Sequence, residues 1–415
     1  MKSERFGCSM TSITISNTRK AVGLGLLVVL GALTAFDSIA IDMYLPAFKT
    51  MEADLNLVPG AMQMSLSVFL MGLAAGQAVS GPLVDSLGRR GPLLVGIVLF
   101  GAASALVALS TNIQMLMIGR FVQGLGGAAG LVIPRAIVSD LYEAREATRI
   151  FTLLIQIQSI SPIAAPLLGG LVLGLWGWSS IFWILVIFAA LALAATAVVV
   201  PETLPPAERA RLTVSNVLRN YWAVLKNRRF LGMSLSAGLV MGTLFGYISA
   251  SSFVFMTYFG LSASNYSIIF AVNSVGMILA GQLNFFLCTK MSARRNLAFG
   301  FITHLVFTVA LLGAVLAGFD SLPVILVLLF LSTSSLCLVF GGITTESMYS
   351  VEHSRAGSAS ALLGVLQYAI GGGAGMVIGL IHNGSLIPLT VVMAVFSTLS
   401  MLCWAIAGRK KPEHF

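Results

Sequence analysis

Charged residues are scarce in this chain. Asp, Glu, Lys and Arg together make up 9% of the 415 residues, whereas soluble domains usually carry about 25%. Hydrophobic residues account for 57% of the sequence. Because so little of the chain suits an aqueous surface, its length does not indicate two or three soluble domains. The composition predicts a membrane protein.

Cysteine is equally sparse, and its placement excludes two kinds of site. The four cysteines are isolated and form no CxxC pair, so neither a zinc site nor a disulfide framework is indicated. The sequence contains no DxxxD, HExxH or GxSxG arrangement, which argues against a membrane-embedded enzyme. The net charge of +9 comes from basic residues scattered among short loops, so no nucleic-acid partner is expected.

Long apolar segments dominate what remains. Twelve of them approach the ~20 residues needed to cross ~30 Å of hydrocarbon, and their unbroken apolarity predicts helices rather than a β-barrel. We place these spans at 21–45, 61–84, 92–110, 114–139, 150–175, 179–200, 231–258, 265–289, 297–318, 322–346, 356–381 and 385–408. The predicted fold is an all-α polytopic membrane protein that contacts the lipid bilayer along these spans.

Lys and Arg are distributed unevenly among the loops. If the N-terminus is cytoplasmic, 21 of the 24 basic residues fall in cytoplasmic segments. Of the others, Arg120 and Arg135 lie within the fourth span, and only Lys49 lies in an outer loop. This positive-inside bias predicts that both termini face the cytoplasm.

A polar segment at 201–229 divides the spans six and six. The expected organisation is a cytoplasmic tail (1–20), a first six-helix half (21–200), a cytoplasmic linker (201–229), a second half (230–408) and a cytoplasmic tail (409–415). Two halves joined by a central linker are typical of transporters built from a structural repeat. We therefore expect pseudo-symmetric halves around a central cavity, and a chain that functions as a monomer.

Five motifs occur in order along the chain: "DMYLP" at 42–46, "GPLVDSLGRRGP" from 81, "RFVQGLGGAA" from 120, "APLLGG" at 165–170 and "PETLPP" at 201–206. Together they resemble the twelve-span drug/proton antiporter group of the major facilitator superfamily, and in particular the bicyclomycin- and chloramphenicol-resistance exporters. The resemblance covers nearly the whole chain. It implies multidrug efflux across the bacterial inner (cytoplasmic) membrane.

The second and fourth motifs have distinct physical readings. Small residues between spans two and three let helix ends approach while charges form a latch, and the resemblance implies that this cluster gates transport: Gly81, Asp85, Gly88, Arg89, Arg90 and, at the end of span four, Asp140. Span five carries a hinge motif in which prolines bend the helix and glycines permit close packing: Pro162, Pro166, Gly169 and Gly170.

Arg120 is a charge inside a predicted span, where it needs an acidic or dipolar partner. Counted at ~1.5 Å per residue, it lies about 9 Å below the outer surface and Asp37 lies about 6 Å from that surface. Asp42 comes out near the outer boundary. We expect Arg120 to pair with one of these acids. Depth favours Asp37, whereas the motif resemblance favours Asp42.

The expected mechanism is exchange of protons for a small, largely apolar drug by alternating access. A carboxylate in such a cavity can take up a proton outside and release it inside. The proton gradient supplies the energy and no cofactor is expected. Six polar residues are candidates for the substrate cavity: Tyr44, Gln63, Gln123, Gln158, Tyr247 and Asn273. Export of an endogenous metabolite is the alternative function.

Overall fold

The computed structural model describes residues 24–209, 213–352 and 355–408, and every regular element in them is helical. The predicted terminal tails, 1–20 and 409–415, lie outside the described residues. Eleven helices are long and apolar enough to cross a membrane, and a bent pair beginning at Gly25 makes a twelfth. The predicted all-helical, twelve-span fold is confirmed.

The first half contains α2 to α9 and one short 3-10 turn. Its elements are α2 (Leu24–Thr34), α3 (Phe36–Asp42), η1 (Leu45–Ala47), α4 (Phe48–Asp54), α5 (Ala61–Leu87), α6 (Arg90–Ala108), α7 (Ile113–Leu141), α8 (Ala144–Trp176) and α9 (Trp178–Val199). The 201–229 segment follows, with a 3-10 turn at Pro206–Glu208 (η2) and a helix, α10 (Val214–Leu225).

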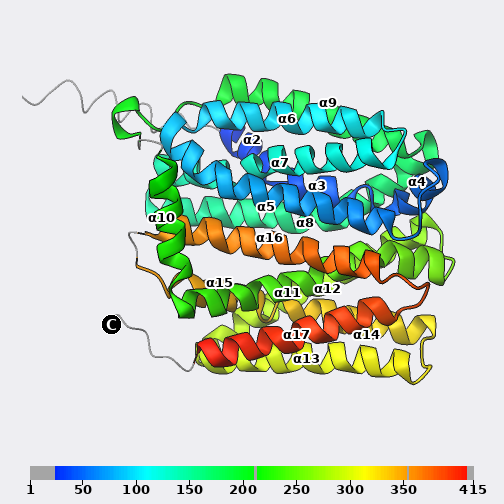
Figure 1. The fold of residues 1–415 in the computed structure, drawn as a ribbon. Helices are drawn as coiled ribbons and strands as arrows, with labels where there is room; N and C mark the ends of the chain where they lie inside the picture. The colour runs from blue at the N-terminus through cyan, green and yellow to red at the C-terminus, as the bar shows by residue number, and fades with distance from the viewer. Residues whose placement is uncertain (1–23, 210–212, 353–354, 409–415) are drawn as a thin grey trace, which may run out of the picture.

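The second half runs from α11 to α17. Its elements are α11 (Arg228–Ser252), a π-helical turn η3 (Phe253–Tyr258), α12 (Ala263–Lys290), α13 (Ala293–Leu316), α14 (Leu322–Leu336), α15 (Phe340–Met348), α16 (Ala356–Leu380) and α17 (Ile387–Ala407). Figure 1 shows the two halves as parallel bundles, one above the other, with α10 running across one end. We call this the linker end and the opposite one the far end.

Two helix pairs make the main contacts between the halves: α5 packs on α16, and α8 packs on α12. In chain order α5 is the second span and α16 the eleventh, while α8 is the fifth and α12 the eighth. Moving each helix by six spans converts one pair into the other. The interface therefore has the pseudo-twofold arrangement expected of two related halves.

The first span differs from the prediction of one helix over 21–45. It breaks at Ala35, bends by 42°, and continues through Asp54 as short segments. The depth count assumed an unbroken helix ending near residue 45, and it placed Asp37 close to the outer surface. That placement is wrong: Asp37 instead lies opposite Tyr368, about midway along α16.

Candidate functional site

Arg120 is fully buried in the first half. Its guanidinium carbon lies 4.2 Å from the centre of the Tyr44 ring and 4.3 Å from that of Phe69. Its Nη1 donates hydrogen bonds to the Ala40 carbonyl at 3.2 Å and to Gln123 Oε1 at 2.5 Å. Aromatic faces and a carbonyl therefore stabilise this cation inside the bundle.

The expected ion pair between Arg120 and an acid of the first span is not formed. No ion pair of Arg120 occurs within the described ranges, and its contact with that span is the Ala40 carbonyl. The broken helix explains this result, because α3 presents a backbone carbonyl to Arg120. Arg120 thus fixes the position of α3 without neutralising Asp37 or Asp42.

Asp37 faces the second half of the molecule. Tyr368 on α16 donates a hydrogen bond from its hydroxyl to Asp37 Oδ2 at 3.1 Å. Asp37 is 4% exposed, and its other oxygen has no hydrogen-bond partner in the structure. Arg135 on α7 interacts electrostatically with Asp37 but forms no ion pair with it at 4 Å or less. The buried Asp37 carboxylate therefore interacts with a residue of each half, Arg135 in the first and Tyr368 in the second.

Asp42, at the end of α3, is also buried, with 3% of its surface exposed. Its charge acts on the hydroxyls of Tyr247 and Tyr266, which belong to the second half. Tyr247 accepts a hydrogen bond from the side-chain amide of Asn273 at 2.6 Å. The two acids of α3 therefore both lie at the interface between the halves.

Arg89, at the linker end, lies between two carboxylates. Its Nη1 is 2.7 Å from Asp85 and its Nε is 3.0 Å from Asp140. Arg90 instead donates to the carbonyl of Ala197, outside this cluster. All of these residues belong to the first half, so the cluster ties α5 and α7 together and does not bridge the two halves.

The segment after α9 closes over this cluster. Glu202 accepts hydrogen bonds from the backbone N–H groups of Arg89 at 2.8 Å and Arg90 at 3.3 Å, and lies 3.8 Å from Arg209. Partial burial opposes ionisation of Glu202, but these donors and the Arg209 charge outweigh it and hold the pKa of Glu202 below its ordinary value. Thr203 donates to Asp140 at 2.7 Å. The "PETLPP" motif thus packs on the predicted gate.

The glycines of the predicted gate differ in surroundings. Gly88 has a φ of +92°, which favours glycine, and a Cβ there would lie 2.4 Å from Glu202 Oε2. Gly81 has only the Ala361 Cβ nearby, 4.0 Å from where its own Cβ would be. Gly88 is therefore the glycine that the contact between loop and linker requires.

The hinge motif of α8 lies in two interfaces. A Cβ on Gly169 would lie 1.9 Å from the Met43 carbonyl, and one on Gly170 would lie 2.9 Å from Ser267 of α12. The carbonyls of Pro166 and Pro162 accept hydrogen bonds from Ser267 at 2.9 Å and Ser274 at 3.4 Å. Pro166 lacks an N–H, so the Pro162 carbonyl has no partner within α8 and Ser274 supplies one.

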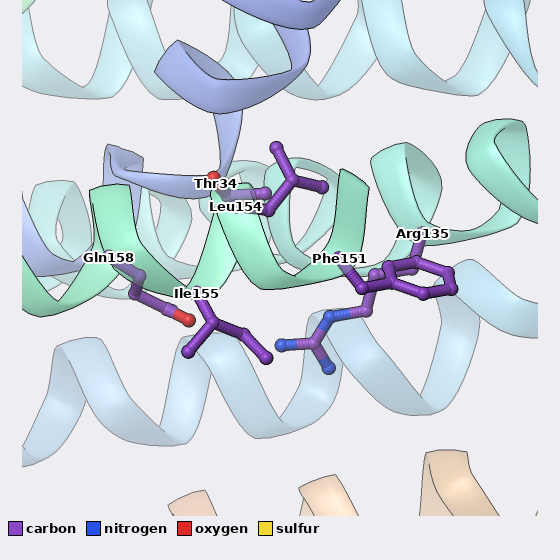
Figure 2. A pocket seen from close by; sticks show the side chains of 6 residues that line it. All are labelled: Thr34, Arg135, Phe151, Leu154, Ile155 and Gln158. Atoms are coloured by element: carbon purple, nitrogen blue, oxygen red, sulfur yellow. The ribbon is translucent and has the colours of Figure 1, made fainter. Parts of the chain in front are cut away.

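Gln158 lines a pocket of about 270 Å³ between α2, α7 and α8. The other five lining residues are Thr34, Arg135, Phe151, Leu154 and Ile155 (Figure 2). The remaining cavity candidates lie elsewhere. Tyr44 and Gln123 contact Arg120, Tyr247 and Asn273 bond each other, and Gln63 lines a smaller pocket beside Lys49 and His382.

Sequence reasoning missed four residues of these clusters: Arg135, Glu202, Thr203 and Tyr368. Arg135 had a usable signal, because a charge inside a span indicates a functional site by default. Glu202 and Thr203 lie in a motif that served only as a family marker. Tyr368 had no signal, since pairing across the halves depends on packing.

Two six-helix bundles with buried charges at their interface define a multi-pass membrane transporter. The chain belongs to the Major Facilitator Superfamily, whose model matches residues 30–376. This membership confirms the resemblance inferred from the motifs.

Similar proteins include two that are named for drug resistance. The chain is 34% identical to the uncharacterized MFS-type transporter YdgK of Bacillus subtilis, over 92% of this chain and 94% of that protein. It is 28% identical to a bicyclomycin resistance protein homolog of Haemophilus influenzae (90% and 94% covered). It is 30% identical to the multidrug resistance protein MdtL of Escherichia coli (86% and 91% covered).

Solved structures share the fold at low sequence identity. The crystal structure of a D-xylose–proton symporter matches with a TM-score of 0.70 and 15% identity, covering 91% of this chain and 96% of that one. A bacterial homolog of the human lysosomal transporter Spinster, in an inward-facing, occupied conformation, matches with a TM-score of 0.69 and 17% identity (93% and 96% covered). These matches concern the fold alone.

Proposed function

We propose that the chain is a proton-coupled exporter of small, largely apolar drugs or antibiotics, similar to bicyclomycin or chloramphenicol. It acts as a monomer in the bacterial inner membrane with the linker end in the cytoplasm, and its energy comes from the proton gradient. The observation that carries the proposal is the hydrogen bond from Tyr368 to Asp37. It places a buried titratable group of one half in direct contact with the other half.

Protonation of Asp37 would act on this contact. An ionised carboxylate accepts the Tyr368 hydrogen bond more strongly than a neutral carboxyl group does. Uptake of a proton from outside therefore weakens the connection between α3 and α16, and release of the proton to the cytoplasm restores it. Asp42 supplies a second buried acid on the same helix, and Arg120 holds that helix in register through the Ala40 carbonyl.

The cluster around Arg89 acts as the gate at the linker end. Its ion pairs hold the ends of α5 and α7 together as one unit, which the segment carrying Glu202 covers. The hinge residues of α8 let that helix shift against α12. Alternating access then consists of the two halves rocking about the α5–α16 and α8–α12 contacts, so that the substrate site opens to one side of the membrane at a time.

Efflux from energised cells tests the proposal. Cells that overproduce the protein and are loaded with radiolabelled chloramphenicol should lose the label faster than control cells, and a protonophore should abolish the difference. Asp37→Asn, Asp42→Asn and Arg120→Ala should each lose this efflux, whereas Asp320→Asn, at a loop carboxylate of the far end, should retain it. Normal efflux by the first three variants would overturn the coupling scheme.

Failure to export drugs of any class, together with altered levels of a cellular metabolite, would instead assign the protein to metabolite export. A set of structurally unlike antibiotics, tested for resistance with and without the protonophore, distinguishes these outcomes.

A further inference from the structure

The pocket beside α8 combines one cation with an apolar wall. Arg135 projects from α7 and is exposed, in contrast to the buried Arg120 of the same helix. Phe151, Leu154 and Ile155 form the apolar side of the pocket. Figure 2 shows the guanidinium of Arg135 reaching past the Phe151 ring toward Ile155. The pocket thus has one charged and one apolar wall.

Arg135 has unused hydrogen-bonding capacity. Across the described part of the chain, its guanidinium makes no ion pair, and no hydrogen bond joins it to another residue. A guanidinium has five N–H donors in a fixed planar arrangement. Thr34 and Gln158 add further polar groups at the same pocket. The Thr34 hydroxyl already donates to the Gly31 carbonyl at 2.8 Å, so Arg135 and Gln158 are the donors available in a lining that is otherwise apolar and has no carboxylate of its own.

We propose that this pocket is the substrate-selective site, and that it takes small uncharged molecules bearing a hydrogen-bond acceptor while rejecting lipophilic cations. The acceptor of the ligand receives hydrogen bonds from Arg135, and its apolar body packs on Phe151, Leu154 and Ile155. A cation in the same place would meet the guanidinium at close range, and the lining contains no carboxylate that could pair with it directly. The volume of about 270 Å³ restricts the ligand to a small molecule.

The choice of a neutral ligand over an anion rests on the proposed function. Arg135 acts electrostatically on Asp37. Protonation of Asp37 removes a negative charge near Arg135, so an anion would bind more tightly when the proton is bound. Proton and anion would then travel together, which is opposite to exchange. A neutral acceptor carries no such penalty.

Binding of three nearly isosteric probes to purified protein in detergent tests this inference. The probes are 2-naphthamide, 2-naphthoate and the 2-naphthamidinium cation, measured by equilibrium dialysis at pH 7 without any proton gradient. Wild-type protein should bind the amide at least about tenfold more tightly than the amidinium, the ratio expected from one hydrogen bond to a charged group. Arg135→Met should lose amide affinity by a similar factor and gain affinity for the cation.

A second variant separates charge from hydrogen bonding. Arg135→Gln should keep most of the amide affinity, because it retains N–H donors, but should no longer reject the cation. Arg219→Met, at an exposed arginine of α10, is the matched control and should leave all three affinities unchanged. Size-exclusion profiles confirm that each variant is folded.

Equal affinity of the wild type for amide and amidinium would overturn the inference, as would tighter binding of the carboxylate, saturable binding of none of the probes, or unchanged selectivity in Arg135→Met. These outcomes leave proton-coupled export itself intact, because the assay uses no gradient. Conversely, loss of protonophore-sensitive efflux with the selectivity preserved would overturn the proposed function alone.

Discussion

Tyr368 and Asp37 are 331 positions apart in the chain, and a hydrogen bond of 3.1 Å joins them in the buried interface between the halves. In the proposed mechanism, this contact connects the protonation of Asp37 to the position of α16. Removal of a single oxygen atom, that of the Tyr368 hydroxyl, would abolish this hydrogen bond.

Tyr368→Phe keeps the ring and removes the hydroxyl. A hydrogen bond to a charged acceptor contributes about 1.5–3 kcal/mol, so we expect efflux of chloramphenicol to fall about tenfold or more and its dependence on external pH to flatten. Initial efflux rates between pH 6 and 8 measure this. Tyr349→Phe, at an exposed phenol, is the control. An unchanged pH profile in Tyr368→Phe would show that the contact plays no part in coupling.

Arg120→Lys tests the stacked guanidinium. Lysine cannot reproduce a planar cation between the Tyr44 and Phe69 rings while also donating to Ala40 and Gln123. We expect a loss of about 2–4 kcal/mol from the missing hydrogen bonds and ring contacts. This should appear as a lower thermal unfolding temperature in detergent. Arg219→Lys should show no change, and equal stability of the two variants would contradict the structural role.

Gly169→Ala tests the contact between α8 and the chain after α3. The added methyl group would lie 1.9 Å from the Met43 carbonyl, so the backbone must shift. Strain of this kind typically costs about 1–3 kcal/mol, and we expect a lower unfolding temperature and impaired efflux. Gly174→Ala lies on the same helix with nothing within 4 Å of the new atom, and should be neutral or slightly stabilising. Similar effects of the two changes would contradict the close contact.

Glu202→Gln tests the attachment of the linker and has a defined pH dependence. Because the folded-state pKa of Glu202 is lowered, its ionised form stabilises the fold at pH values above the ordinary carboxyl pKa. That contribution is lost as the pH falls through the lowered value. The group is partly exposed, so we expect the change to cost about 1 kcal/mol or less.

Thermal unfolding of wild type and Glu202→Gln at a series of pH values measures this difference. It should be constant from neutral pH down to about 5 and disappear on further acidification below the ordinary carboxyl range. Glu346→Gln, at a carboxylate paired with Arg229 in the second half, provides a comparison at a site remote from the linker. A difference for Glu202→Gln that grows on acidification would contradict the assignment.

The helical fold was predictable because its cause is local. Segments of about 20 apolar residues must satisfy their own backbone groups in lipid, and the helices α5 to α9 begin and end within a few residues of the predicted spans, apart from the start of α8. The first span was the exception. Its break at Ala35 follows no proline, and the helical segments continue past Pro46 to Asp54, so apolarity alone could not show where it bends.

The site was predictable only in part, for a related reason. Arg120 and the acids of α3 were recognisable as buried charges, but their partners depend on helix rotation, which a one-residue break can change. The Arg120 guanidinium stacks on Tyr44 and Phe69 where an acid was expected. The contact of Asp37 with the second half required Tyr368 of α16 to lie opposite α3, and no local pattern encodes that placement.

The serines that face the α8 prolines have a consequence for the ease of motion. Ser267 and Ser274 each place a hydroxyl near two carbonyls, one in the opposite half and one four residues earlier in α12. The carbonyl within α12 lies 2.9 Å from each hydroxyl. When the halves separate, each hydroxyl can therefore keep the bond within its own helix, and water entering the gap can serve the released Pro162 carbonyl. The contact between α8 and α12 can therefore break and re-form in every transport cycle without leaving a buried donor unpaired, which makes it a reversible contact.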